Sequence, residues 1–317
     1  MTVKGRLSIL SILLLVLVIL FLLLGLNSRN WDYAVSRRIP KLIAIVLVGS
    51  SIAFSSTVFQ TITNNRILTP SVLGLDSLYM FIQTIIVFVF GSTILSVLGI
   101  SFNFIISLLF MIFFSVLLFT ALFKNRDNNI FFLLLFGMIF STLFQSLTSF
   151  MQVLIDPNEF LVIQNRSLVS FNNINTDLLW IAIGLILLVL IYTSRQIKYL
   201  DVLSLGRDTA INLGVEYHKV IKRMLIIVAI LVSISTALVG PITFLGLMVT
   251  NINREFLKTY RHKYLIPGAI LISTIILVGG QLVAERIIDF KTPINVIINF
   301  LGGVYFIYLI LKEGNIL

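Results

Sequence analysis

The 317-residue sequence contains no cysteine and little charge, and both shortages limit what the protein can be. Without cysteine there is no disulfide framework, no thiolate metal ligand and no cysteine nucleophile. Only 11% of the residues are charged, whereas soluble domains have about 25%. Because 58% of the residues are hydrophobic, the chain cannot cover itself with a polar surface. We therefore expect lipid to be its main solvent.

Histidine is also scarce, since only His218 and His262 occur and both are expected in loops. A buried histidine metal site is therefore not expected, and no metal ligand or catalytic residue is assigned to this chain. The net charge of +10 could suit nucleic acid, but the basic residues lie between apolar runs, where the positive-inside bias places them. No nucleic-acid partner is expected.

The sequence is rich in continuous apolar runs. A membrane-spanning helix needs about 20 such residues, and continuous runs favour helices over the alternating strands of a barrel. The first run is too long for a signal-peptide core, so we expect it to be retained. Residues 1–317 are predicted to form one all-α polytopic membrane domain of about ten spans, at 7–26, 40–62, 76–98, 102–123, 130–151, 178–194, 224–240, 242–253, 264–284 and 293–311.

An even number of spans places both termini on one side of the membrane, and we predict that this side is the cytoplasm. With that topology, 16 of the 23 Lys and Arg residues lie inside and 7 outside, as the positive-inside rule requires. Asp76, Glu285 and Arg286 are expected at span ends. The lack of a carboxylate at mid-membrane disfavours an ion-coupled secondary transporter. An intramembrane enzyme is disfavoured because no catalytic groups converge, and a sensor or structural subunit without transport stays a lesser alternative.

The longest polar segment, at about 195–223, is predicted to be cytoplasmic. It should contain a short helix, because Asp208 complements the positive end of a helix dipole and Gly214 suits a left-handed stop. Ala210 and Leu213, three residues apart, are expected on one face. Such a helix could dock into a groove of a soluble partner, or it could be an ordinary interfacial helix.

A second interruption is Gly240-Pro241, which should end a helix. The run from there to Arg254 is too short to span alone. Broken helices are tolerated where protein or a water-filled cavity covers their backbone. The polar side chains predicted inside the spans either bond between helices or line a pathway; they are Ser55, Ser56, Thr57, Gln60, Gln83, Gln145 and Gln281.

Five stretches resemble, in chain order, the motifs of one transporter family. They are Arg38-Ile39-Pro40-Lys41 with Leu47-Val48-Gly49 and Gln60; Asn65 to Pro70 with Leu73-Gly74; Leu205-Gly206, Ala210 and Leu213-Gly214-Val215; Gly240-x-Ile242-x-Phe244-x-Gly246-Leu247; and Thr292-Pro293-Ile294 with Gly302 and Phe306. Over almost its whole length the chain resembles the FecCD-type permeases of type II ABC importers, which handle iron–siderophores, haem and vitamin B12.

Some positions depart from the family pattern. Lys41 replaces an arginine, Ile67 and Val304 replace prolines, and Thr250-Asn251 replaces Pro-His. These departures, together with the stretch 167–175, resemble the catecholate-siderophore subgroup of Gram-positive bacteria.

The resemblance implies a permease subunit that is not itself an enzyme. It would move an iron–siderophore across the bacterial cytoplasmic membrane by alternating access, with a catecholate favoured over haem or vitamin B12. The chain has no Gly-x-x-x-x-Gly-Lys phosphate loop, so ATP and Mg would be held by two separate cytoplasmic ATPases. The other implied partners are a second permease (a paralogue favoured, a homodimer possible) and an extracellular lipid-anchored or periplasmic binding protein.

The resemblance also assigns roles to residues. The ATPase-coupling residues would be Ser204, Leu205, Gly206, Arg207, Asp208, Ala210, Leu213 and Gly214. Arg38, Lys41 and Arg286 would dock the binding protein, although Glu285 is expected to neutralise Arg286. Residues of the translocation path or of helix packing would be Gln60, Asn65, Pro70, Gly240, Pro241 and Gly246.

Overall fold

The structure is a computed structural model that describes residues 2–25, 31–122, 130–172, 174–194, 196–289 and 292–314. All regular secondary structure in these ranges is helical. The elements are α1 (Val3–Leu23), α2 (Trp31–Thr63), η1 (Pro70–Leu73), α3 (Leu75–Leu122), α4 (Ile130–Leu154), α5 (Pro157–Ser167), α6 (Thr176–Ser194), α7 (Ile197–Leu203), α8 (Arg207–Asn212), α9 (Tyr217–Val239), α10 (Leu245–Leu257), α11 (His262–Arg286) and α12 (Ile294–Gly314).

Eight of the described helical segments are long and apolar enough to cross a bilayer. The other two expected spans are shorter, namely Leu75–Gly91 at the start of α3 and the 13-residue α10. The predicted all-helical, multi-span membrane protein is therefore confirmed. The expected spans 76–98 and 102–123 fall in one element, α3, whose backbone leaves helical geometry at Gly91 (φ 73°) and Gly99 (φ 79°). Glycine adopts such angles without steric cost.

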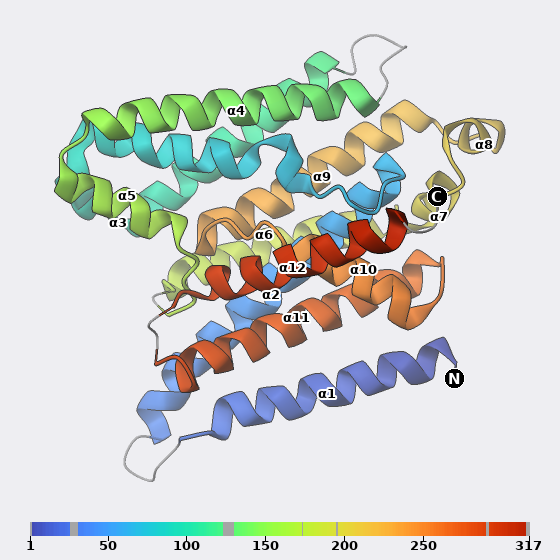
Figure 1. The fold of residues 1–317 in the computed structure, drawn as a ribbon, viewed down its shortest axis with the longest axis horizontal. Coiled ribbons are helices and arrows are strands. Elements are labelled where there is room, and N and C mark those ends of the chain that lie inside the picture. The colour runs from blue at the N-terminus through green and yellow to red at the C-terminus, as the bar shows by residue number, and fades with distance from the viewer. Residues whose placement is uncertain are drawn as a thin grey trace.

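The long helices run side by side along the longest axis of the molecule (Figure 1). The two chain ends lie at one end of this bundle together with α7 and α8, and we call it the inner end. The opposite, outer end holds the start of α2, α5 and the end of α11. This arrangement agrees with the expected placement of both termini and the polar segment on one side.

The centre of the bundle is formed by α2 and α9, because 72% of the most apolar stretch of each is buried, against 11% in α1. Helix α2 packs along α9, α10 and α11. Helices α1, α4 and α12 expose most of their apolar side chains, so lipid or another chain must cover them in a membrane. Helices α2 and α11 pack against each other and both run from the inner to the outer end of the bundle (Figure 1).

Candidate functional site

At the inner end the polar segment forms two short helices, α7 and α8, where the sequence predicted one. Gly206 joins them with φ +95°, and Asp208 lies in the first turn of α8 as expected. Gly214 has φ +80°; its N–H donates to the Ile211 carbonyl (2.9 Å) while the Val215 N–H donates to the Ala210 carbonyl (3.1 Å). This pair of bonds is the Schellman stop that glycine favours. Residue 195 lies outside the described residues and 217–223 belong to α9, so we call 196–216 the inner segment.

The apolar side chains of the inner segment divide into buried and exposed. Ala210 is fully buried, whereas Leu213, three residues further on, is 61% exposed, so only Leu213 of this pair is presented to a partner. Leu213 still lies in helical register, because its N–H donates to the Thr209 carbonyl at 3.0 Å, and it caps the C-terminal end of α8. Leu205 is 60% exposed and Ile211, which the sequence reasoning missed, is 45% exposed. Three large apolar side chains exposed on a polar segment mark a surface that another protein could cover.

The polar members of the expected coupling set surround this surface. The Ser204 hydroxyl donates to the Asp201 carbonyl at 2.7 Å, which closes the end of α7. Arg207 and Asp208 are exposed. Gly206 and Arg207 line a cavity of about 190 Å³ that Asn65 and Leu68 also line, so the inner segment lies against the turn that follows α2.

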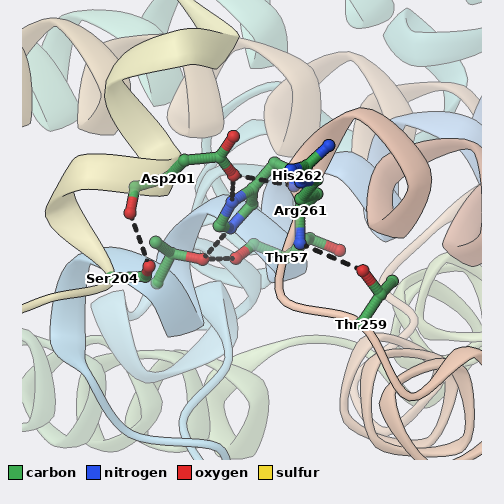
Figure 2. Close-up of polar contacts among 7 residues, drawn as sticks. Thr57, Asp201, Ser204, Thr259, Arg261 and His262 are labelled. Atoms are coloured by element: carbon green, nitrogen blue, oxygen red, sulfur yellow. Dashed lines mark hydrogen bonds and ion pairs between the residues drawn. The ribbon is translucent and has the colours of Figure 1, made fainter.

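His262 contradicts the expectation that both histidines lie in loops. It is the first residue of α11 and is 1% exposed, while His218 lies in α9. Its Nδ1 lies 2.7 Å from Asp201 Oδ1, and its backbone N–H donates to the same oxygen at 2.8 Å (Figure 2). Its Nε2 lies 2.8 Å from the Thr61 hydroxyl.

Among the described residues there is no group of three or more His, Cys, Asp or Glu side chains placed to hold a metal ion.

At the outer end the three expected docking residues all make bonds within the chain. Arg38 Nη1 donates to the Leu22 carbonyl and Arg286 Nη2 to the Leu24 carbonyl, each at 2.6 Å. These bonds fasten the end of α1 to α2 and α11. Lys41 pairs with Glu285, and their side chains are 12% and 9% exposed. Glu285 therefore neutralises Lys41, and the expectation that it neutralises Arg286 is wrong.

Residues 168–175, which we call the outer loop, form walls of the outer cavities (residue 173 lies outside the described ranges). Asn172 and Asn175 border a cavity of about 610 Å³ beside Lys41. Two further cavities, of about 430 and 270 Å³, share Asn165, Leu168 and Ser170. Gln281, predicted either to bond between helices or to line a path, lines one of them and donates to Asn172 Oδ1 at 3.2 Å. The lining is rich in amides and hydroxyls, and Arg37, Lys41 and Asp177 add charged groups to the largest of these cavities.

The interruption at Gly240-Pro241 is covered by protein, as expected for a broken helix. Helix α9 ends at Val239, and Gly240 has φ +101°. The Ser170 N–H of the outer loop donates to the Val239 carbonyl at 3.2 Å, so this carbonyl at the end of α9 has a partner outside the helix. Gly240 lines the smallest outer cavity, while Pro241 is half-buried next to it.

The remaining expected path residues pack helices together. Gln60 Nε2 and Asn251 Nδ2 both donate to the Arg66 carbonyl, at 2.6 and 3.0 Å, and hold the turn after α2 against α10. Within that turn Asn65 Oδ1 accepts from the Ile67 N–H at 2.9 Å, and Pro70 begins η1. A Cβ on Gly246 would lie 2.0 Å from Ser56 Oγ, so glycine lets α10 approach α2.

The profile of the FecCD transport family matches residues 6–312, which is nearly the whole chain. The chain belongs to the FecCD transport family. As a FecCD permease it is a membrane-embedded subunit of an ABC importer, and ATP hydrolysis is the task of a separate chain.

Among curated relatives, this FecCD permease is 63% identical to the petrobactin import system permease protein YclO of Bacillus subtilis (strain 168), over 90% of each chain. It is 37% identical to the petrobactin permease FatC of Bacillus anthracis over 91% of this chain and 81% of that one, and 28% identical to FatD of the same organism over 87% and 80%. A solved metal-chelate type ABC transporter in an inward-facing conformation superposes with a TM-score of 0.85 at 25% identity, covering 98% of this chain and 100% of that chain.

Proposed function

We propose that this FecCD permease carries a ferric catecholate-type siderophore of the petrobactin class into a bacterial cell. The observation that carries the proposal is the 63% identity to YclO over 90% of both chains. The amide-rich outer cavities are compatible with it, because amides and hydroxyls bind a large polar chelate weakly enough to release it. Haem or vitamin B12 is the alternative cargo.

The proposed mechanism is alternating access driven from the inner end. Two cytoplasmic ATPases, which bind ATP and Mg, would cover Leu205, Ile211 and Leu213, the apolar side chains that the inner segment exposes. Closure of the ATPases would then move the helices as rigid bodies. A binding protein would deliver the chelate at the outer end, where Arg38, Lys41 and Arg286 are the proposed docking residues.

The second permease is proposed to be a paralogue. FatC and FatD are two petrobactin permeases of one organism, and this chain is similar to both. A homodimer is the alternative, and purification of the assembled importer from a host that expresses both permeases would distinguish the two.

The direct test is complementation of a Bacillus subtilis strain that lacks YclO. Expression of this chain should restore uptake of radiolabelled ferric petrobactin, and unlabelled hemin or vitamin B12 should not compete. The protein must first be shown to reach the membrane. Competition by hemin, or no uptake despite normal membrane levels, would refute the proposed substrate.

An ion-coupled secondary transporter is separated from this mechanism by its energy source. Uptake through an ABC importer should stop when ATP is depleted and should continue when an uncoupler dissipates the proton gradient while ATP is maintained. The reverse pattern would contradict an ATP-driven mechanism.

A further inference from the structure

The three residues Asp201, His262 and Thr61 form one hydrogen-bonded group that joins α7, α11 and α2, and we call it the inner node. We propose that the inner node transmits the movement of the ATPase-contacting segment to the α2–α11 pair, so that its residues position the helices during transport. This inference rests on the proposed function. It names positioning residues that lie outside the expected coupling set.

The bonds of the inner node are short and largely shielded from water. His262 is 1% exposed and Thr61 is 4% exposed, whereas the Asp201 side chain is 39% exposed and marks the boundary with the inner surface. Hydrogen bonds to an ionised group are about twice as strong as neutral ones, and they gain strength away from water. The node therefore attaches α7 firmly to α2 and α11.

The proton positions in the node follow from its donors and acceptors. An ionised carboxylate only accepts, so His262 Nδ1 must carry the proton directed at Asp201. In the neutral ring Nε2 is then an acceptor that faces the Thr61 hydroxyl, whose single proton can be directed either at Nε2 or at the Thr57 carbonyl. The same hydroxyl lies 2.8 Å from the Thr57 carbonyl, one turn earlier in α2 (Figure 2 labels Thr57, Asp201 and His262). Asp201 thus orients the ring, and the ring reaches α2.

The position of the node in the bundle gives it a mechanical role. Helix α7 packs on α2 and α11, and it continues directly into α8, the helix between the exposed Leu205 and Leu213. At the other end of the bundle, α2 and α11 are joined by the Lys41–Glu285 pair beside the largest outer cavity. A displacement of α7 therefore acts on two helices whose far ends border the proposed entry site.

The test uses the assembled importer, with its ATPases and partner permease, in proteoliposomes. Asp201→Ala removes the acceptor for both His262 donors, while Asp201→Asn keeps a carbonyl oxygen in the same place. We expect Asp201→Ala to lower ferric petrobactin uptake per ATP hydrolysed by about tenfold, with normal ATPase co-purification, and Asp201→Asn to stay within about twofold of the wild type. A merely structural residue would lower both activities in proportion.

Two substitutions of His262 test its contact with Asp201 and its contact with Thr61 separately. His262→Asn keeps a donor near the Nδ1 position and so preserves the bond to Asp201, while His262→Gln keeps a group near the Nε2 position and so preserves the reach to Thr61. Both should show intermediate coupling if the whole node transmits movement. Should Asp201→Ala fail to fold, Thr61→Val compared with Thr61→Ser tests the same path from α2, with loss expected only for valine.

A readout without substrate separates this inference from the proposed cargo. The chain has no cysteine, so Ser36→Cys, at the exposed outer part of α2, supplies a single thiol beside the largest outer cavity. Its labelling rate in the assembled importer should change on addition of ATP and Mg, and Asp201→Ala should abolish that change while Asp201→Asn preserves it. An ATP-dependent change that survives Asp201→Ala would overturn the inference. Failure of wild-type uptake alone would count against petrobactin and leave this readout intact.

Discussion

The inner and outer ends of this permease both carry the residues expected to meet other proteins, but they present them differently. At the inner end Leu205, Ile211 and Leu213 project from a polar segment and are at least 45% exposed. At the outer end Arg38, Lys41 and Arg286 already bond within the chain, to Leu22, Glu285 and Leu24. An exposed apolar side chain gains stability only when a partner covers it, whereas a bonded cation is already partly satisfied. We therefore expect substitutions in the inner apolar surface to weaken partner binding more than substitutions of the outer cations do.

The largest effect should come from a charge in the inner apolar surface. Leu213→Glu would place a carboxylate where the ATPase is proposed to cover apolar side chains, and burying an unpaired charge is costly. We expect ATPase co-purification and ferric siderophore uptake to fall at least about tenfold. Asn212→Glu adds the same charge at the neighbouring exposed polar position and should have much less effect. Equal losses in both variants would show that charge on the inner segment, rather than apolar contact, sets the affinity.

The next effect should be on stability at the outer end. Lys41→Met removes the partner of Glu285, whose side chain is 9% exposed, and leaves a carboxylate poorly solvated. Breaking a buried pair in this way costs about 3 kcal/mol, so thermal unfolding in detergent should occur at a clearly lower temperature. Lys41→Met combined with Glu285→Gln should recover much of the loss, since no charge is then left unpaired. Unchanged unfolding of Lys41→Met would mean that water and the Gln281 amide, which already donates to Glu285 Oε1 at 2.8 Å, satisfy the carboxylate without Lys41.

The difference between the two ends also explains which features the sequence could predict. Span positions follow from hydrophobicity, and the turns at Gly214 and Gly240 follow from local chemistry, because each depends on neighbouring residues. The pairing of Lys41 with Glu285 joins residues 244 apart in the chain, and the Thr61–His262 bond joins residues 201 apart. Which partner a charged or polar residue meets is decided by how helices pack, and spacing along the chain carries no such signal.

The burial of His262 is another feature that the local sequence could not predict. Its neighbours Arg261 and Lys263 are polar, which predicts a loop, and the apolar pattern begins only at Tyr264. The structure begins α11 at His262. The first N–H groups of a helix have no acceptor within the helix, and Asp201 from α7 accepts the bond from the His262 N–H. Ile211 was missed for a related reason, since the face of a six-residue helix cannot be read from so short a pattern.

A smaller effect should separate docking from anchoring at the outer end. Arg286→Gln removes the charge of an exposed side chain, and because glutamine is two atoms shorter, water replaces the guanidinium at the exposed Leu24 carbonyl. Unfolding should then change by less than about 1 kcal/mol. If Arg286 also docks the binding protein, the dissociation constant should rise about fivefold and depend less on salt, as expected for a charge at the edge of an interface. An unchanged dissociation constant would assign Arg286 to anchoring α1 alone.

The smallest effect is expected at the inner end, from the ion pair between Glu216 and Lys219. Both side chains are 66% exposed and their charged atoms lie 3.0 Å apart, three residues apart along the chain. Pairs of this kind contribute about 0.5 kcal/mol or less, because water solvates both charges in any case. Lys219→Ala should therefore leave unfolding, ATPase co-purification and uptake within experimental error of the wild type. A clear loss of co-purification would place Lys219 in the ATPase contact and extend that contact beyond Leu205, Ile211 and Leu213. The inner end would then bind its partner through charge as well as through apolar surface.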